Sequence, residues 1–244
     1  MKKQRFGILD AIRGFSLISM ILFHASWDLV YIYGFDWQWY KETPGYIWQQ
    51  SICWVFIFLS GFCQPFGSKK LKRALQVFGA GLLVTAVTLA VMPEARIVFG
   101  VLTLLGSCAL ICLPFEKSIE SLSPGLGFGL SAALFALTRN VNIGYLGFEG
   151  LRFIKLPEAW YSNLFTAYLG FPARSFFSAD YFSLIPWFFL FMAGYFLNLL
   201  LKKQGLLDKL RFSGPKGLEF LGRHSLLIYL LHQPLIYLIL LLIL

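Results

Sequence analysis

The 244-residue sequence has little charge. Only 14% of its residues are Asp, Glu, Lys or Arg, whereas 58% are hydrophobic and 18% are aromatic. An average globular domain is roughly 25% charged. This shortage excludes an ordinary water-soluble protein, because a chain with so many apolar residues is expected to lie in a lipid bilayer. The apolar runs are continuous rather than alternating, which favours helices over a closed barrel and predicts an all-α, polytopic transmembrane helical bundle.

Cysteine and histidine are scarce, with four and three residues respectively. Cys108 and Cys112 are one helical turn apart, but their apolar segment contains no histidine or acidic partner that would complete a metal site. We therefore expect small buried side chains and no metal. The sequence also lacks an internal repeat and a low-complexity tract, so we expect a single integral-membrane domain over residues 1–244.

Seven apolar segments have the length of a membrane span. They lie near residues 8–32, 46–66, 74–92, 97–115, 123–138, 182–201 and 218–243. The net charge of +9 does not indicate nucleic-acid binding, because the positive charges lie at the ends of these segments rather than on one soluble face. With a cytoplasmic N-terminus, fourteen basic residues, Lys2, Lys3 and Arg5 among them, lie inside and six lie in outer loops, which is the usual bias.

The longest segment outside the predicted spans is 139–181, which this topology places on the outer side. It mixes charged residues with aromatic ones such as Trp160 and Tyr161, a composition typical of the membrane interface. It is also too long for a connection without structure of its own. We therefore expect an outer loop or lid, or a partly re-entrant element.

Four ionisable side chains interrupt the first apolar segment: Asp10, Arg13, His24 and Asp28. At about 100° per residue, all four fall within about 60° of one another on one helix face. A charge near the bilayer centre costs at least about 2.5–3.5 kcal/mol, so this face must contact protein or water and is a candidate functional site. In the predicted orientation, Asp10 and Arg13 lie near the cytoplasm and the other two lie toward the outer half.

Two pairs on this face are spaced for chemistry. Asp10 and Arg13 are spaced for an ion pair on one helix face. Either the guanidinium of Arg13 binds a phosphate-bearing ligand, or the two charges only neutralise each other and stabilise helix packing. Asp28 follows His24 by four residues and is placed to hold one imidazole nitrogen while the other acts as a general base. The alternative is a buried histidine that bonds to a neighbouring helix.

The last apolar segment carries further polar residues. His232 lies deep in it, either as a catalytic group or as a polar contact between helices, and Pro234 is expected to kink the helix just beyond. Arg223 and His224 lie at its cytoplasmic end, where cationic side chains can bind headgroup phosphates and anchor the helix at the membrane interface.

Two polar residues precede the sixth apolar segment. Asp180 and Ser183 are each suited to cap the N-terminus of that helix, because their short side chains accept hydrogen bonds from its first backbone N–H groups. The surrounding aromatic residues are typical of a membrane interface, so we expect a structural role here.

The spacing of Arg13 and His24 resembles the first-helix signature of integral-membrane acyltransferases of the acyltransferase-3 type, and Val55–Phe62 is similar to that superfamily's second-helix motif. The chain is more similar still to the bacterial branch related to the heparan-α-glucosaminide N-acetyltransferase catalytic domain. The motifs that carry this similarity are Ile97–Gly106, Asp180–Trp187 and Gly222–Pro234. Together the motifs cover nearly the whole chain, from residue 9 to residue 234.

The resemblance implies a membrane acyltransferase that moves an acetyl or other acyl group from cytosolic acyl-CoA, usually acetyl-CoA, to an acceptor at the outer side. The acceptor would be a sugar or amine, such as a glycan or a lipid-linked saccharide. It implies that His24 is the catalytic base or a transient acyl carrier, which Asp28 would orient. It also implies that Arg13 helps to hold the coenzyme, and we assign Asp10, Arg223 and His232 to the same binding group.

The resemblance places the protein in a bacterial inner membrane, with the lipid bilayer as a partner, and it allows a homodimer. One position departs from the pattern, because relatives often carry a histidine in the fourth-span motif where this chain has Thr103. Two alternatives therefore stay open. One is a proton-coupled transporter or exporter that uses buried His and Asp side chains as a proton relay, and the other is a catalytically degenerate membrane scaffold.

Overall fold

The computed structural model describes residues 6–244, so the predicted cytoplasmic charges Lys2, Lys3 and Arg5 lie outside the described residues. The chain is mostly helical and divides into two compact units. The first unit comprises Met1–Leu59 and Gln204–Leu244, and the second comprises Ser60–Lys203. The first unit therefore combines an N-terminal segment of the chain with its C-terminal segment.

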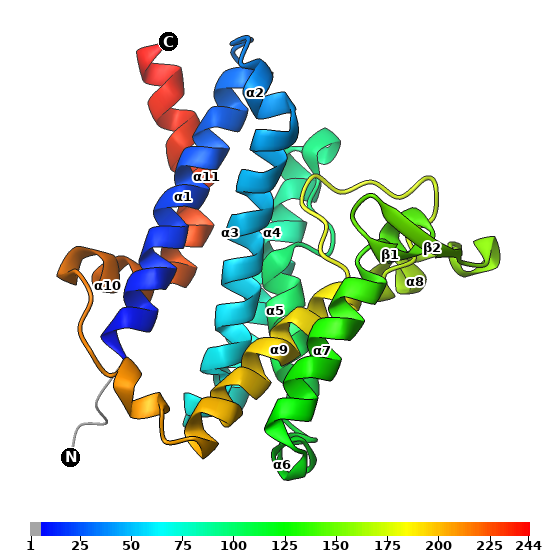
Figure 1. The fold of residues 1–244 in the computed structure, drawn as a ribbon. Helices are drawn as coiled ribbons and strands as arrows, with labels where there is room; N and C mark the ends of the chain where they lie inside the picture. Colours follow the sequence, from blue (N-terminus) through cyan, green and yellow to red (C-terminus); the bar gives the residue numbers. More distant parts are fainter. Residues whose placement is uncertain (1–5) are drawn as a thin grey trace. The chain divides into compact units, whose positions relative to one another are not determined.

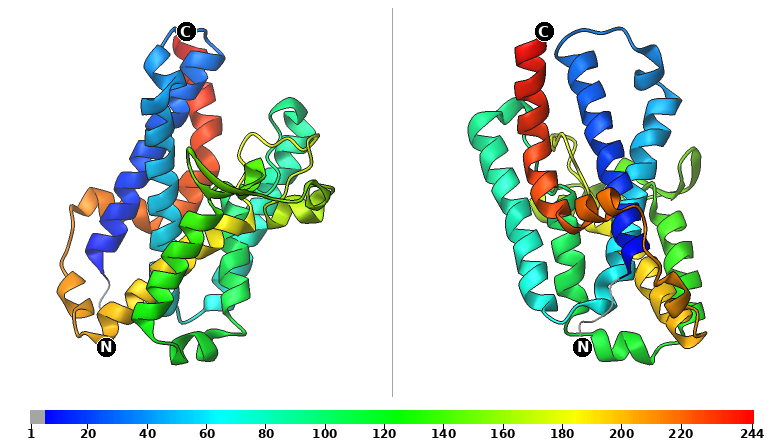
Figure 2. Two further views of the ribbon diagram at one scale, coloured as in Figure 1. Left: turned by 45° about the vertical axis from the view of Figure 1, so that its right-hand side comes forward. Right: turned by 90° about the vertical axis from the view of Figure 1, so that its left-hand side faces the viewer.

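The first unit is built around α1. Its elements are α1 (Gly7–Tyr31), α2 (Gln38–Lys41), most of α3 (Thr43–Cys63), the 3-10 turn η5 (Leu207–Leu210), α10 (Lys216–Arg223) and α11 (Ser225–Ile243). Helix α1 packs against α10 and α11, which lie beside it in Figure 1 and Figure 2. Leu17 and Met20 of α1 and Ile52 of α3 form its buried core. The indole N–H of Trp48 donates to Oγ of Ser19 at 2.8 Å and ties α3 to the same helix.

Two glycines let α1 and α10 approach until their backbones touch. A Cβ atom at Gly14 would lie 2.0 Å from the backbone oxygen of Leu218, and a Cβ atom at Gly222 would lie 1.9 Å from that of Asp10. No side chain fits at such distances, so glycine is required at both positions. This contact fixes the position of α10 along the first half of α1.

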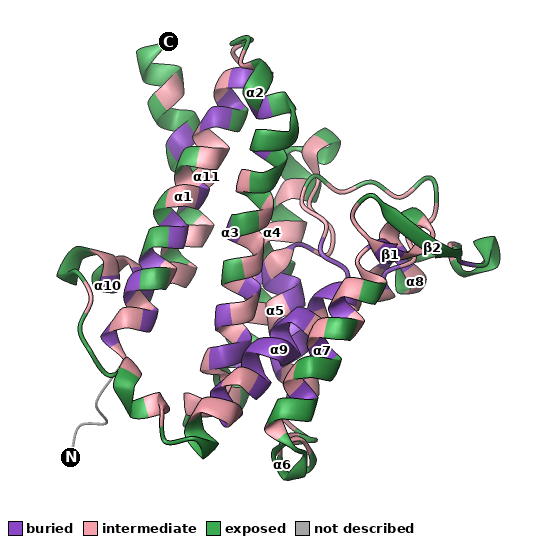
Figure 3. Ribbon diagram, viewed as in Figure 1, coloured by how far each residue is buried: buried purple, intermediate pink, exposed green. Residues whose placement is uncertain are grey.

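The second unit consists of two pairs of packed helices, two short helices and a small hairpin. Its helices are α4 (Lys70–Val91), α5 (Val101–Cys112), α6 (Glu116–Ser121), α7 (Pro124–Thr138), α8 (Leu164–Leu169) and α9 (Leu184–Lys203). Its 3-10 turns are η1 (Gln64–Phe66), η2 (Pro93–Ala95), η3 (Val141–Ile143) and η4 (Glu158–Trp160). Helix α7 packs along α9, and α4 packs along α5. Most of α9 is buried (Figure 3), and the side-chain amide of Asn198 donates to the backbone oxygen of Phe62 at 2.9 Å.

The segment 139–181 has structure of its own. Strands β1 (Tyr145–Phe148) and β2 (Leu151–Lys155) form an antiparallel hairpin, which adds a small sheet to the predicted all-α architecture. The amide of Asn140 donates to the backbone oxygens of Glu149 and Leu151, at 2.8 Å each, and holds the turn. Beyond the hairpin, a hydrogen bond from Lys155 and the nearby charge of Arg174 lower the pKa of the Glu158 carboxyl. The outer location of this segment and its role as a lid stay predictions.

Five helices of the described chain are long and apolar enough to cross a membrane: α1, α3 with η1, α4, α9 and α11. Helices α5 and α7 have only 12 and 15 residues. At a rise of 1.5 Å per residue they reach about 18 Å and about 22 Å, less than a hydrocarbon core of about 30 Å. The span predicted over 218–243 is two helices, because the chain turns at His224 between α10 and α11 (Figure 2). Helix α11 itself continues through Pro234. The total of seven spans and the cytoplasmic N-terminus stay predictions.

The contact between α1 and α10 predicts the effect of adding one methyl group. Gly222→Ala places a Cβ atom against the backbone of Asp10, so we expect it to lower the free energy of unfolding by about 1–3 kcal/mol. Gly217→Ala is the matched control in the same helix, because a Cβ atom there meets nothing within 4 Å. Thermal unfolding of both variants in detergent checks this. Equal midpoints for the two would contradict the close approach.

Candidate functional site

The polar face of α1 meets α10 at one end and α11 at the other. Gly222 on α10 lies against the backbone of Asp10 near the start of α1, and α11 contacts its second half, around His24 and Asp28. The face predicted from helical periodicity is therefore covered by the C-terminal helices of the same unit. Its four ionisable residues fall into two clusters.

The first cluster, here called the charged cluster, consists of Asp10, Arg13, Glu219 and Arg223. Asp10 pairs with Arg13 on its own helix at 3.3 Å and with Nε of Arg223 on α10 at 3.5 Å. Arg223 also pairs with Glu219 one turn before it, and the other oxygen of Glu219 accepts from the backbone N–H of Gly214 at 2.9 Å. Glu219 is buried, whereas the side chains of Arg13 and Arg223 are 20% and 40% exposed. Two acids and two arginines cancel in charge.

The second cluster, here called the histidine cluster, consists of His24 and Asp28 of α1 and His232 and Gln233 of α11. The two imidazole rings contact each other edge to face, with their centroids 4.8 Å apart. The Asp28 side chain is fully buried, and its Oδ1 accepts a hydrogen bond from the side-chain amide of Gln233 at 2.8 Å. Nδ1 of His232 bonds to the backbone oxygen of Tyr229.

Three buried polar atoms of the histidine cluster lack a hydrogen-bond partner among residues 6–244. They are Oδ2 of Asp28, Nε2 of His232 and Oε1 of Gln233. Buried polar atoms are nearly always paired, so unpaired ones that gather in one place indicate a site that receives a ligand or a proton. The histidine cluster can therefore hold or move a proton within an apolar helix interface.

The family model for heparan-alpha-glucosaminide N-acetyltransferase, catalytic, matches residues 5–234. The chain belongs to this family. The match includes every residue of both clusters, and membership indicates a membrane acetyltransferase. No curated protein and no solved structure matches the chain.

The Asp28 carboxylate of this acetyltransferase has a different partner from the predicted one. It was predicted to orient His24 from one turn away on the same helix, but it bonds to Gln233 on α11. His24 contacts the ring of His232 instead. The expected ion pair of Asp10 and Arg13 is confirmed.

The predicted coenzyme-binding residues divide between the two clusters. Arg223 joins Asp10 and Arg13 in the charged cluster, whereas His232 lies with His24. The turn at His224 separates them, and His224 itself is exposed and bonds to the backbone oxygen of Phe220 at 2.8 Å.

Sequence reasoning did not single out two members of the clusters. Glu219 has a recognisable signal, because it precedes Arg223 by four residues on a helix, the spacing of an ion pair. Gln233 has a weaker signal, since an amide beside His232 in an apolar helix needs a polar partner, but that partner is 205 residues away in sequence.

Two other predicted positions lie in the second unit. Oδ2 of Asp180 accepts from the backbone N–H of Val101 at the start of α5, a different helix from the one that it was predicted to cap. Thr103 is the position at which the resemblance predicted a histidine. It is buried against Gly81, and its hydroxyl has no hydrogen-bond partner in the described part of the chain.

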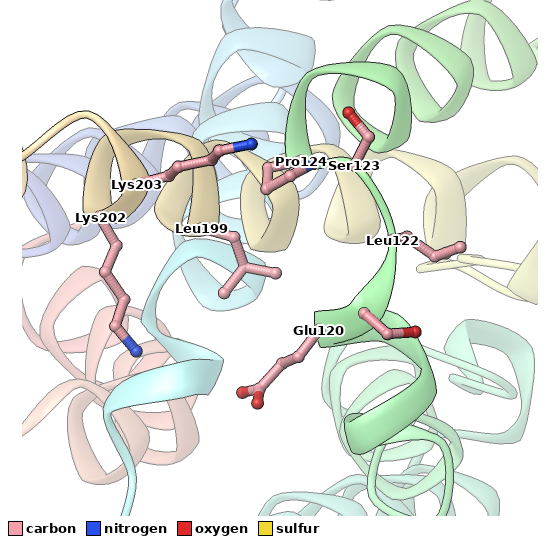
Figure 4. A pocket seen from close by; sticks show the side chains of 8 residues that line it. Glu120, Leu122, Ser123, Pro124, Leu199, Lys202 and Lys203 are labelled. Carbon is pink, nitrogen blue, oxygen red and sulfur yellow. The ribbon is translucent and has the colours of Figure 1, made fainter.

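A cavity of about 680 Å³ also lies in the second unit, between the start of α7 and the end of α9 (Figure 4). It is lined by Glu120, Ser121, Leu122, Ser123, Pro124, Leu199, Lys202 and Lys203. None of these residues is a histidine, so the cavity has no group suited to proton transfer near neutral pH. Over residues 6–244, no group of three or more histidine, cysteine or acidic side chains is placed to hold a metal ion.

The bond between Asp28 and Gln233 predicts a double-mutant result. Gln233→Met removes the donor and leaves the buried carboxylate unpaired, so we expect it to lower the free energy of unfolding by about 1–3 kcal/mol. Combining it with Asp28→Leu should recover part of that loss, because neither of the two side chains then leaves a buried polar atom unpaired. Leu235→Met, at an exposed position of the same helix, is the control. If the shifts in thermal unfolding midpoint of the two single variants simply add in the double variant, the bond is contradicted.

Proposed function

We propose that this acetyltransferase takes an acetyl group from acetyl-CoA, with the phosphates of the coenzyme at the charged cluster and the acetyl group at the histidine cluster. The acceptor is the hydroxyl or amine of a sugar, such as a glycan or a lipid-linked saccharide, that enters from the outer side. The observation that supports this most is the placement of both clusters on one face of α1.

The separation of the clusters suits a coenzyme A thioester. Arg13 and His24 are eleven positions apart on an unbroken helix. At 1.5 Å per residue this is about 16 Å along the axis, a distance that an extended pantetheine arm can bridge. A ligand of that shape could place its charged end at the arginines and its thioester beside the imidazoles.

The chemistry of the charged cluster is compatible with phosphate. A guanidinium has five N–H donors in a planar fork, so Arg223 has more donors than its contacts with Asp10 and Glu219 use. The side chain of Arg223 is 40% exposed and so accessible to a ligand. Because the four charges cancel, a bound phosphate would compete with Asp10 and Glu219 for the same two arginines.

The histidine cluster supplies the groups that acyl transfer needs. A neutral imidazole removes a proton from an attacking hydroxyl or amine, or attacks the thioester itself and carries the acyl group. His24 takes one of these roles. Apolar surroundings keep bulk water away from the thioester and so favour transfer over hydrolysis.

The proposal includes an orientation and a setting. A cytoplasmic N-terminus puts the charged cluster on the side where acyl-CoA is made and the histidine cluster nearer the outer side. An acyltransferase-3-type ancestry is supported by the motifs in α1 and α3, and a bacterial inner membrane by the motifs of the bacterial branch at 97–106, 180–187 and 222–234. The lipid bilayer is then the surrounding partner, and a homodimer is compatible with the exposed apolar surface of α11.

One observation favours a second function. A buried carboxylate and two contacting imidazoles also form a proton relay, as in proton-coupled transporters. Such a protein would move its substrate in response to a proton gradient and without acetyl-CoA. A catalytically inactive scaffold would show neither activity.

Replacing His24 tests the proposed reaction. We expect His24→Ala to lower acetyl transfer at least about 100-fold, because a positioned acid–base group contributes that much. His224→Gln is the control, since this histidine is exposed and outside both clusters. Radiolabelled acetyl-CoA and glucosamine, supplied to membranes that contain each variant, measure the transfer. Wild-type rates in folded His24→Ala protein would refute the proposal.

Labelling of single cysteines tests the orientation. Gly150→Cys at the exposed tip of the hairpin should react with a membrane-impermeant maleimide in intact cells. Gln204→Cys, just after α9, should react only after the membrane is opened. Both signals are read above that of the unsubstituted protein, and the reverse pattern would show that the topology is inverted.

A further inference from the structure

The tautomer of His232 follows from its hydrogen bond. Nδ1 of this ring lies within hydrogen-bond distance of the backbone oxygen of Tyr229. A carbonyl oxygen only accepts, so Nδ1 must carry the proton. In the neutral ring the second nitrogen, Nε2, then carries a bare lone pair and can only accept.

This lone pair is buried and unpaired. Nε2 of His232 is closed off from solvent and has no donor within the part of the chain that the structure describes. The ring contacts that of His24, with centroids 4.8 Å apart, so the unpaired acceptor belongs to the ring through which α11 meets His24. A group that arrives there with an N–H or O–H would supply the missing donor.

We infer that His232 is a second catalytic residue, whose Nε2 takes the proton from the hydroxyl or amine of the acceptor during acetyl transfer. This inference rests on the proposed function and deepens it. His232 was assigned to coenzyme binding from the sequence, but it lies apart from the arginines and beside His24. The inference therefore moves His232 from holding the donor to activating the acceptor.

The acceptor step balances without any further reactant. The acceptor's nitrogen or oxygen bonds to the acetyl carbonyl carbon, and the bond from that carbon to its carrier atom breaks. Because His232 is the base in this step, His24 takes the role of acyl carrier. The carrier atom is therefore an imidazole nitrogen of His24, which has taken the acetyl group from the coenzyme sulfur and released its own ring proton to that sulfur, and it keeps the electron pair. The acceptor's proton goes to Nε2 of His232 and then to the carrier atom, which restores the lone pair on His232.

Asp28 and Gln233 act as positioning residues for this base. Gln233 is the next residue after His232, and its bond to the fully buried Asp28 fixes the rotation of α11 against α1. That rotation keeps the two imidazoles in contact. Asp28 therefore serves the reaction through His232 and α11, whereas the sequence assigned it to His24.

The tautomer can be measured without any activity. The chain has only three histidines. Nitrogen-15 NMR of histidine-labelled full-length protein in detergent, assigned with the His24→Gln, His224→Gln and His232→Gln variants, reports which nitrogen of each ring is protonated. We expect His232 to show a protonated Nδ1 and a bare Nε2. A protonated Nε2 with a bare Nδ1 would overturn the role of His232 as the proton acceptor.

Kinetics test the catalytic role, with radiolabelled acetyl-CoA as donor and glucosamine as the probe acceptor. We expect His232→Gln to lower kcat at least about 100-fold, because glutamine fills the space but takes no proton, and to leave the KM for acetyl-CoA unchanged. His224→Gln is the matched control, since His224 also bonds through Nδ1 to a backbone oxygen but is exposed. Added imidazole should raise the kcat of His232→Ala, a rescue that a purely structural role would not produce.

The outcomes separate the two claims. If the wild-type protein transfers acetyl groups and the folded His232→Gln variant does so equally well, His232 does not have the inferred role. The proposed function then still stands. A wild-type protein that transfers no acetyl group refutes the proposed function, and the role of His232 falls with it. Loss of kcat in His232→Gln together with imidazole rescue in His232→Ala supports both.

Discussion

The cost of placing polar groups in an apolar helix organises the first unit. Helix α1 carries two carboxylates, a guanidinium and an imidazole on one face, and each is expensive to leave against lipid. The C-terminal helices relieve that cost group by group. Arg223 pairs with Asp10, and Gln233 donates to Asp28. Helix α1 packs against α10 and α11 because their polar side chains pair with the polar face of α1.

Close packing makes this compensation geometrically possible. Side chains as short as aspartate reach across a helix interface only if the backbones are close, and Gly222 allows α10 to touch the backbone of Asp10 itself. The turn at His224 then redirects the chain, so that α10 serves the charged cluster and α11 serves the histidine cluster. A single continuous helix in place of α10 and α11 would fix the rotation of its polar residues relative to one another. It could not contact both the charged cluster and the histidine cluster in this way.

Periodicity was sufficient to predict the polar face of α1, the Asp10–Arg13 pair and the helical character of the chain, because these depend on spacing within one helix. The partners of Asp28 and His24 were not predictable, since they depend on how α11 is rotated against α1. The break at His224 was not predicted, because a mostly apolar run follows it and neither proline nor glycine occupies the position. The bond of Asp180 to the start of α5 was not predictable for a similar reason: the donor, Val101, is 79 residues away in sequence. In each case the missing information is tertiary.

The charged and histidine clusters differ in how fully their polar atoms are satisfied, and that difference indicates where chemistry occurs. In the charged cluster each carboxylate has at least one cationic partner, as expected for a contact that also stabilises the fold. In the histidine cluster three buried atoms lack partners over the described residues, and each such atom costs roughly 1–3 kcal/mol. A fold gains nothing from that cost, so it is tolerated where a substrate or a proton completes the hydrogen bonds. The unpaired nitrogen of His232, on the ring that contacts His24, is therefore not explained by the packing of α11 alone.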